Sequence, residues 1–148
     1  LSPNGMVFMQ SHRTEPKEIW AAIPAWARQA LNEKQARVFA LDTVQIAKDV
    51  SSRADLQQRM QGIVLLGIFL RITPFQKDLA LSEEQIFRGV EKSLRKYFGK
   101  RGDRVVQDNL LAVGRGFHEV IEVPREVMAS TAAADQANAK LRVMQGGM

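Results

Sequence analysis

The first fifty residues alternate short apolar segments with helix signals, and this alternation most restricts the fold. Residues 5–9 are apolar and lie between polar turn residues, which is typical of a buried strand. A second such segment, 37–41, is followed by Asp42, whose carboxylate can cap a helix over 43–50. Because parallel strands are joined through helices, the alternation predicts an α/β fold.

Between these strands the sequence predicts two short helices. Thr14 can cap the first helix, whose first turn would hold Glu15 and Pro16. Pro24 lacks an amide hydrogen and crowds the preceding turn, so it should end this helix and precede another over 25–33. The aromatic side chains of Trp20 and Trp26 on either side of Pro24 favour core packing, with a cofactor stack or a partner groove as the alternatives.

A long central helix is predicted over 55–71, where apolar residues recur at intervals of three and four. Gly62 and Gly67 lie inside it, and each lowers helix propensity by about 1 kcal/mol relative to Ala. Both glycines therefore indicate close approach of a neighbouring backbone.

Two more helices follow in the predicted order. Ser82 and Gln85 form a capping box for a helix over 83–98. Asp103 should cap a last long helix, whose apolar face continues to Ile121 before Pro124 closes it. The expected fold is a helix-rich α/β structure: a partial Rossmann-like, doubly wound layer with few parallel strands and several packed helices.

Composition excludes most kinds of catalytic site within the chain. There is no Cys, which rules out thiolate nucleophiles, Cys-ligated zinc and iron–sulfur clusters here. The two histidines, His12 and His118, lack metal-ligand spacing, and no nucleophile elbow or phosphate-binding Gly-rich loop is present. We therefore predict no catalytic residue, no metal site and no complete active site in this chain.

Charge and hydropathy restrict the partners. The formal net charge is +5, and residues 92–104 hold six Lys or Arg, with only Asp103 inside the run and Glu91 before it as acidic residues. A solvated helix face is the usual meaning of such a run, and an independent basic helical module that binds nucleic acid or an acidic protein is the alternative. The longest apolar run, 62–70, is too short to span a membrane, and no secretory signal begins the chain. A cytoplasmic protein without a nucleic-acid or membrane partner is expected.

Several segments resemble a known family when they are taken in order. The most specific is Tyr97-Phe98-Gly99-Lys100-Arg101-Gly102, which is followed by a Val-Val pair and by Asn109. The stretch ARVFALDTVQIAKDV at 36–50 is the next most specific. Together with ARQALNEK at 27–34 and the apolar helix, they resemble the gamma-type domain of pyruvate:ferredoxin (flavodoxin) oxidoreductases, members of the 2-oxoacid:ferredoxin oxidoreductase family.

The resemblance implies what the parent enzyme does. It would decarboxylate pyruvate or another 2-oxoacid oxidatively to an acyl-CoA and pass electrons to ferredoxin or flavodoxin. Thiamine diphosphate, iron–sulfur clusters and coenzyme A would bind to the parent, whose other domains or subunits would be the partners of this chain. No cofactor is expected on the chain itself, apart from an anion contact of Lys100 and Arg101 with coenzyme A. The isolated chain should be inactive.

The resemblance also implies a domain division. Residues 1–124 would form part of the gamma-type domain, and 125–148 would be a linker or a peripheral helix, because composition changes after Pro124. The family domain begins with a Gly-rich strand–turn–helix unit that does not precede Leu1. The expectation is therefore that this chain corresponds to the C-terminal half of that domain.

Overall fold

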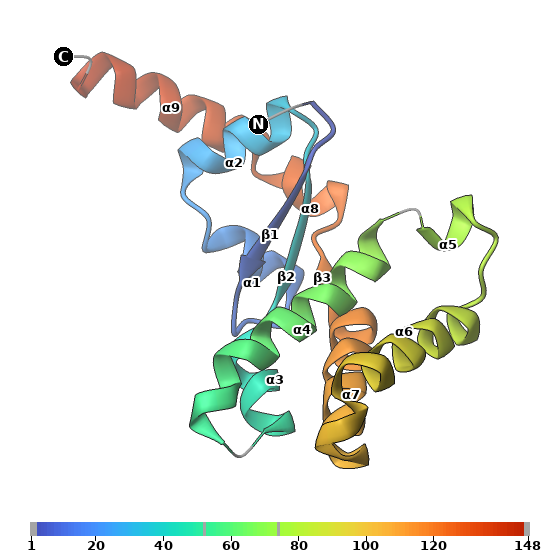
Figure 1. Ribbon diagram of the computed structural model, residues 1–148. Coiled ribbons are helices and arrows are strands. Elements are labelled where there is room, and N and C mark those ends of the chain that lie inside the picture. The colour runs from blue at the N-terminus through green and yellow to red at the C-terminus, as the bar shows by residue number, and fades with distance from the viewer. Residues whose placement is uncertain (1–2, 52, 74, 147–148) are drawn as a thin grey trace. The chain divides into compact units, whose positions relative to one another are not determined.

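A computed structural model of the chain describes residues 3–51, 53–73 and 75–146 (Figure 1). The fold divides into two compact units. The sheet unit comprises Leu1–Leu41 and Ile121–Met148, and the helical unit comprises Asp42–Val120. The chain thus leaves the sheet unit after the second strand and returns to it through the short third strand.

The sheet unit holds a small mixed sheet in its described residues. β1 (Met6–Gln10) and β2 (Arg37–Leu41) pair in parallel, with Val7 opposite Val38. β3 (Ile121–Glu122) pairs antiparallel with β2, which places β2 in the centre. The predicted strands, their parallel pairing and the helix-rich α/β fold are confirmed. The antiparallel third strand was not predicted.

The described residues of the sheet unit form four helices. The predicted break at Pro24 is confirmed, because Pro24 is the N-cap of the second helix. The predicted cap at Thr14 is wrong: Glu15 is the N-cap of the first helix, and no side chain caps it. Pro16 occupies the first helical position, where a missing amide hydrogen costs nothing. The helices are α1 (Pro16–Ala21), α2 (Ala25–Glu33), α8 (Arg125–Ser130) and α9 (Ala132–Gly146).

The core of the sheet unit joins segments from both ends of the chain. Val38 and Ala40 of β2 are fully buried in one apolar cluster with Trp20 of α1 and Met128 of α8. The predicted core role of the two tryptophans is confirmed for Trp20 and wrong for Trp26, which is 60% exposed. Apart from Thr131, residues 125–146 are helical, and the proposed domain boundary at 124 stays a prediction.

The described part of the helical unit contains no strand, and its helix ends follow local signals. Asp42 Oδ1 accepts a hydrogen bond of 3.0 Å from the Gln45 amide, as predicted for its cap. The predicted ranges 43–50, 55–71 and 83–98 are confirmed to within one residue. The elements are α3 (Thr43–Val50), α4 (Ala54–Ile72), α5 (Phe75–Asp78), α6 (Glu83–Phe98), the 3-10 helix η1 (Gly99–Arg101) and α7 (Asp103–Glu119).

Two glycines allow α4 and α7 to approach each other very closely. A Cβ atom at Gly67 would lie 2.0 Å from the Val113 carbonyl oxygen, and one at Gly116 would lie 2.2 Å from the Val64 carbonyl oxygen. The backbone approach predicted from Gly67 is therefore confirmed. The same prediction for Gly62 is wrong, since no neighbouring atom lies within 4 Å of a Cβ placed there.

Both ends of α7 differ from the prediction. Gly102, with φ of 109°, is the N-cap, and Asp103 is the first helical residue. A positive φ favours Gly, so the turn before α7 depends on this residue. The helix ends at Glu119 and does not include Ile121, because the backbone of Ile121 pairs with Ala40 in the sheet.

The capping box of α6 gives a first testable prediction. The Ser82 hydroxyl accepts a hydrogen bond of 3.1 Å from the Gln85 amide, and the Gln85 side chain accepts one of 2.8 Å from the Ser82 amide. We expect Ser82→Ala to lower the free energy of unfolding by about 1 kcal/mol. The control is Ser93→Ala inside α6, which should be neutral or slightly stabilising because Ala has the higher helix propensity. Urea unfolding of both variants makes the comparison, and equal effects would contradict the capping role.

Candidate functional site

The residues predicted to contact an anion lie in the tight connection between α6 and α7, which we call the basic turn (99–104). Lys100 and Arg101 are in η1, and both side chains are exposed. Arg104, in the first turn of α7, is exposed as well. The basic turn therefore presents three cations to solvent within five residues.

A fourth cation joins the basic turn from α4. The guanidinium carbon of Arg59 lies 4.6 Å from the centre of the Phe98 ring, and that of Arg101 lies 5.8 Å from it. Both distances are within the range of cation–π contacts. The sequence analysis missed Arg59, because thirty-nine residues separate it from Phe98 and no spacing signal links them.

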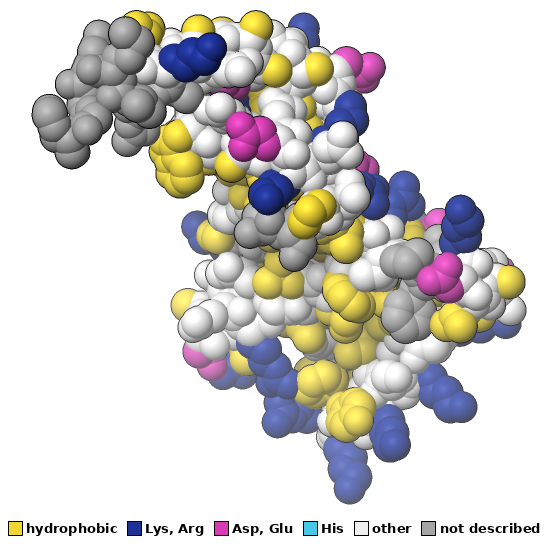
Figure 2. Space-filling model, turned by 90° about the horizontal axis from the view of Figure 1, so that it is seen from above, with side chains coloured by type: hydrophobic (Ala, Val, Ile, Leu, Met, Phe, Trp, Pro, Cys, Tyr) yellow, Lys and Arg dark blue, Asp and Glu magenta, His cyan; other side chains and the backbone are white. Residues whose placement is uncertain are grey.

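Only part of this positive charge is neutralised by neighbouring carboxylates. Arg95 pairs with Asp103 at 2.8 Å and with Glu91 at 3.5 Å, and the bond to Asp103 is the main cause of its raised pKa. Among the residues that the structure describes, Lys92, Lys96, Lys100 and Arg104 form no ion pair. Figure 2 shows Lys and Arg side chains projecting around hydrophobic side chains in the lower half of the view. Such a surface can bind an anion or an acidic protein.

An apolar groove lies between α4 and α6 in the same unit. It has a volume of about 450 Å³ and is lined mostly by aliphatic side chains. Leu66 and Leu70 line it from α4, and Ile86, Val90 and Leu94 line it from α6. We call this feature the α4–α6 groove. Tyr97 lines the same groove one residue before Phe98.

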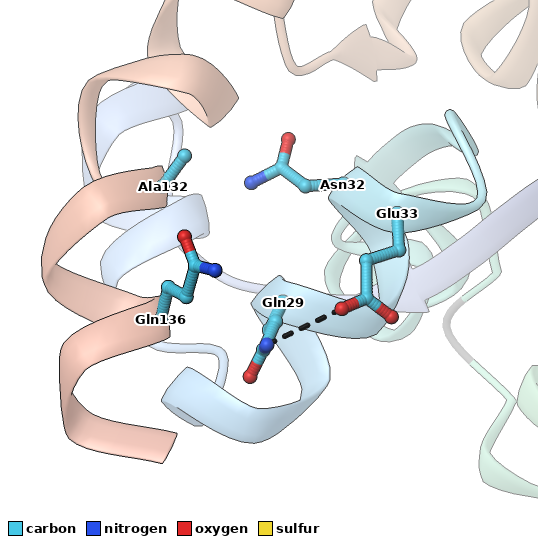
Figure 3. Close-up of a pocket in the computed structure, with 5 residues that line it drawn as sticks. All are labelled: Gln29, Asn32, Glu33, Ala132 and Gln136. Carbon is cyan, nitrogen blue, oxygen red and sulfur yellow. Dashed lines mark hydrogen bonds between the residues drawn. The ribbon is translucent and has the colours of Figure 1, made fainter. Parts of the chain in front are cut away.

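A small polar pocket of about 250 Å³ lies in the sheet unit between α2 and α9 (Figure 3). Gln29, Asn32 and Glu33 line it from α2, and Ala132 and Gln136 line it from α9. The Gln29 amide donates a hydrogen bond of 3.2 Å to the Glu33 carboxylate. Since its charged group is a carboxylate, this pocket does not suit the phosphates of coenzyme A.

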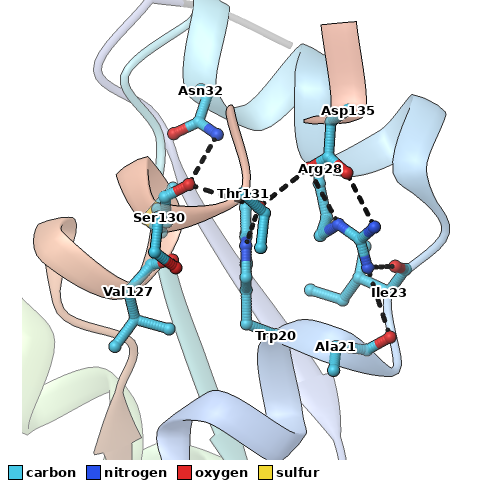
Figure 4. A network of polar contacts seen from close by, with 10 residues as sticks. Trp20, Ala21, Ile23, Arg28, Asn32, Val127, Ser130, Thr131 and Asp135 are labelled. Carbon is cyan, nitrogen blue, oxygen red and sulfur yellow. Dashed lines mark hydrogen bonds and ion pairs between the residues drawn. The ribbon is translucent and has the colours of Figure 1, made fainter. Parts of the chain in front are cut away.

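A buried ion pair joins α2 to α9 (Figure 4). Arg28 donates two hydrogen bonds, of 2.9 and 2.7 Å, to the two carboxylate oxygens of Asp135, which is 1% exposed. The Thr131 hydroxyl donates to Asp135 at 2.8 Å and accepts from the Trp20 indole at 2.7 Å. The bond from Arg28 lowers the pKa of Asp135, and the bond from Thr131 adds to this effect. Arg28, Asp135, Thr131 and the Trp20 indole each have a hydrogen-bond partner within this network. We therefore assign the network a structural role.

The two histidines belong to different units, His12 to the sheet unit and His118 to the helical unit. His12 is exposed after β1, and His118 Nε2 lies 2.9 Å from a carboxylate oxygen of Glu83. In the described ranges, no group of three or more His, Asp or Glu side chains could hold a metal ion. None of the described helices combines the length and the apolar character that a membrane span requires.

Comparison with known proteins identifies the family. The family model for pyruvate ferredoxin/flavodoxin oxidoreductase matches residues 1–119 of this chain. The chain belongs to that family. The resemblance inferred from the order of the sequence segments is thereby confirmed.

Curated relatives of this family match only over a small part of their own length. The pyruvate-flavodoxin oxidoreductase of Trichormus variabilis is 23% identical over 120 residues, which cover 79% of this chain and 9% of the relative. The probable pyruvate-flavodoxin oxidoreductase of Escherichia coli is 24% identical over 124 residues, 84% of this chain and 10% of the relative. The pyruvate:ferredoxin oxidoreductase of Moorella thermoacetica is also 24% identical, over 123 residues that cover 83% of this chain and 10% of the relative. The chain thus spans about a tenth of the length of these oxidoreductases.

Proposed function

We propose that this chain is a structural segment of a larger cytoplasmic enzyme that decarboxylates pyruvate, or another 2-oxoacid, oxidatively to an acyl-CoA. The electrons would pass to ferredoxin or flavodoxin. The observation that carries the proposal is the family match over residues 1–119. The names of the relatives and their roughly tenfold greater length support a role as one part of such an enzyme.

The cofactors of this reaction are proposed to bind mainly outside the chain. Iron–sulfur clusters are held by Cys thiolates, and this chain contains no Cys. Thiamine diphosphate is likewise assigned to other parts of the parent. Coenzyme A differs, because its phosphates are anions and the exposed side chains of Lys100 and Arg101 are suited to contact them. The partners of the chain would be the other domains or subunits.

The activity is tested on the parent enzyme that contains this chain. We expect pyruvate-dependent reduction of ferredoxin or flavodoxin that requires coenzyme A, and no turnover by the 148-residue chain alone. Measurement of reduced carrier with and without coenzyme A distinguishes these cases. A parent that oxidises no 2-oxoacid would contradict the proposal.

The coenzyme A contact is tested by removing the two cations. In the parent enzyme, Lys100→Ala combined with Arg101→Ala should raise the Michaelis constant for coenzyme A about fivefold, because an exposed ionic contact contributes up to about 1 kcal/mol. The Michaelis constant for pyruvate should change little. The control is Lys48→Ala with Lys77→Ala, which removes two exposed cations elsewhere in the helical unit. An unchanged constant for coenzyme A would exclude the contact and leave the structural role intact.

A further inference from the structure

The α4–α6 groove leaves much apolar surface uncovered. Among its lining residues, Leu66 is 41% exposed and Tyr97 is 74% exposed. Large hydrophobic side chains gathered on one face usually mark a surface that another protein segment covers. The groove is lined along α6 from Gln85 to Tyr97, which is about 18 Å or three helical turns.

A glycine in the lining leaves room for close approach of such a segment. Gly89 lies inside α6, where Gly lowers helix propensity relative to Ala. A Cβ atom placed on Gly89 would have no neighbour within 4 Å, so no contact in the described chain explains the residue. The contrast with Gly67 is informative, because that glycine meets the backbone of α7. The open space at Gly89, which lies in the groove, leaves room for the backbone of a docked helix.

The charges beside the groove indicate the chemistry of the segment. The three glutamates of α6 all have partners: Glu83 lies against His118, Glu84 against Arg88, and Glu91 against Arg95. Lys92 and Lys96 are one turn apart on the exposed side of α6 that carries Gly89 and Ser93, and neither forms an ion pair with any described residue. A row of Asp or Glu side chains on the docked segment would complement the charges of Lys92 and Lys96.

We propose that the α4–α6 groove receives an amphipathic helix of about three turns from another part of the parent oxidoreductase. Its apolar stripe would cover Leu66 and Val90, its small residues would lie against Gly89, and its Asp or Glu side chains would face Lys92 and Lys96. The mainly aliphatic lining favours a permanent contact within the enzyme over transient docking of an electron carrier, since permanent interfaces are the more hydrophobic ones. This inference rests on the proposed function.

The test uses the full parent enzyme. Coupling of amines to carboxylates with a zero-length carbodiimide, followed by mass spectrometry, should link Lys92 and Lys96 to Asp or Glu of one segment with helical apolar spacing. Acetylation of these two lysines should be at least tenfold slower than that of Lys48 and Lys77, the exposed controls. Gly89→Leu should restore their acetylation and remove the links, whereas Gly89→Ala should have a smaller effect. Neither change should unfold α6, because both replacements favour a helix.

Several results would overturn the inference. They are acetylation of Lys92 and Lys96 at the control rates, links to a second copy of this chain, and links that appear only when ferredoxin or flavodoxin is added. Retention of the links in the Gly89→Leu variant would also contradict it. Failure of the proposed function is distinct, because the parent would then show no 2-oxoacid oxidation whatever the state of the groove.

Discussion

Replacing Gly67 by Ala is expected to destabilise the helical unit by about 3 kcal/mol or more. The added methyl group would lie 2.0 Å from the Val113 carbonyl oxygen, which belongs to the backbone of α7 and cannot rotate away. The two helices would have to separate, with loss of packing along both of them, and this places the cost at the upper end of overpacking effects. Thermal or urea unfolding of the chain measures the change.

Gly62→Ala in the same helix provides the matched control. Gly62 is exposed, and a Cβ atom there meets nothing within 4 Å, so this variant should gain up to about 1 kcal/mol from helix propensity. Gly116→Ala should behave like Gly67→Ala, because its Cβ atom would meet the Val64 carbonyl oxygen at 2.2 Å. Similar stability of the Gly67 and Gly62 variants would show that α4 and α7 are not packed as described.

Replacing Arg28 by Ala is expected to destabilise the sheet unit by a similarly large amount. It would leave the carboxylate of Asp135 buried, with Thr131 as its remaining partner in the network. Removal of one member of a buried ion pair costs about 3–5 kcal/mol, because an uncompensated charge stays in the interior. The control is Arg53→Ala, which breaks an exposed pair with Asp55 and should change stability little. Equal effects of the two variants would contradict a structural role for the buried pair.

The effect of Arg28→Ala should also depend on pH. The folded protein holds the pKa of Asp135 below its ordinary value, mainly through the hydrogen bond from Arg28. The pair therefore stabilises the fold fully above the unfolded pKa of about 3.9, and this stabilisation is lost as the pH falls through the folded value. The stability difference between wild type and variant should be largest near neutral pH and shrink below about pH 4. A difference that grows in acid would exclude this linkage.

Local signals account for the parts of the fold that could be predicted. The Asp42 cap and the Ser82–Gln85 capping box act within three residues, and the helices that they begin were predicted correctly. The break between α1 and α2 was predictable because Pro24 has no amide hydrogen and its ring crowds the preceding turn. The Thr14 cap was wrong because Pro16 at the first helical position places the N-cap one residue later, at Glu15, whose side chain makes no capping bond.

The candidate site was predictable only in part. Lys100 and Arg101 belong to one contiguous charge run, and the sequence alone indicated that they would be exposed between two helices. Arg59 could not be assigned to the same cluster, because its contact with Phe98 depends on how α4 packs against the C-terminal end of α6. The α4–α6 groove escaped prediction for the same reason, since its lining comes from two helices whose apolar stripes each resembled ordinary core positions.

Residue identity and short spacing were enough to predict the two parallel strands, the ranges of α3, α4 and α6, the absence of a thiol-based site and the family. Tertiary packing was needed to show that Gly67 meets a neighbouring backbone while Gly62 does not, although both are glycines within one helix. It also decided that Arg28 and Asp135, 107 positions apart, form a buried pair. Such contacts depend on which face each helix presents to its neighbours. That orientation is set by close packing of the whole core and not by local sequence.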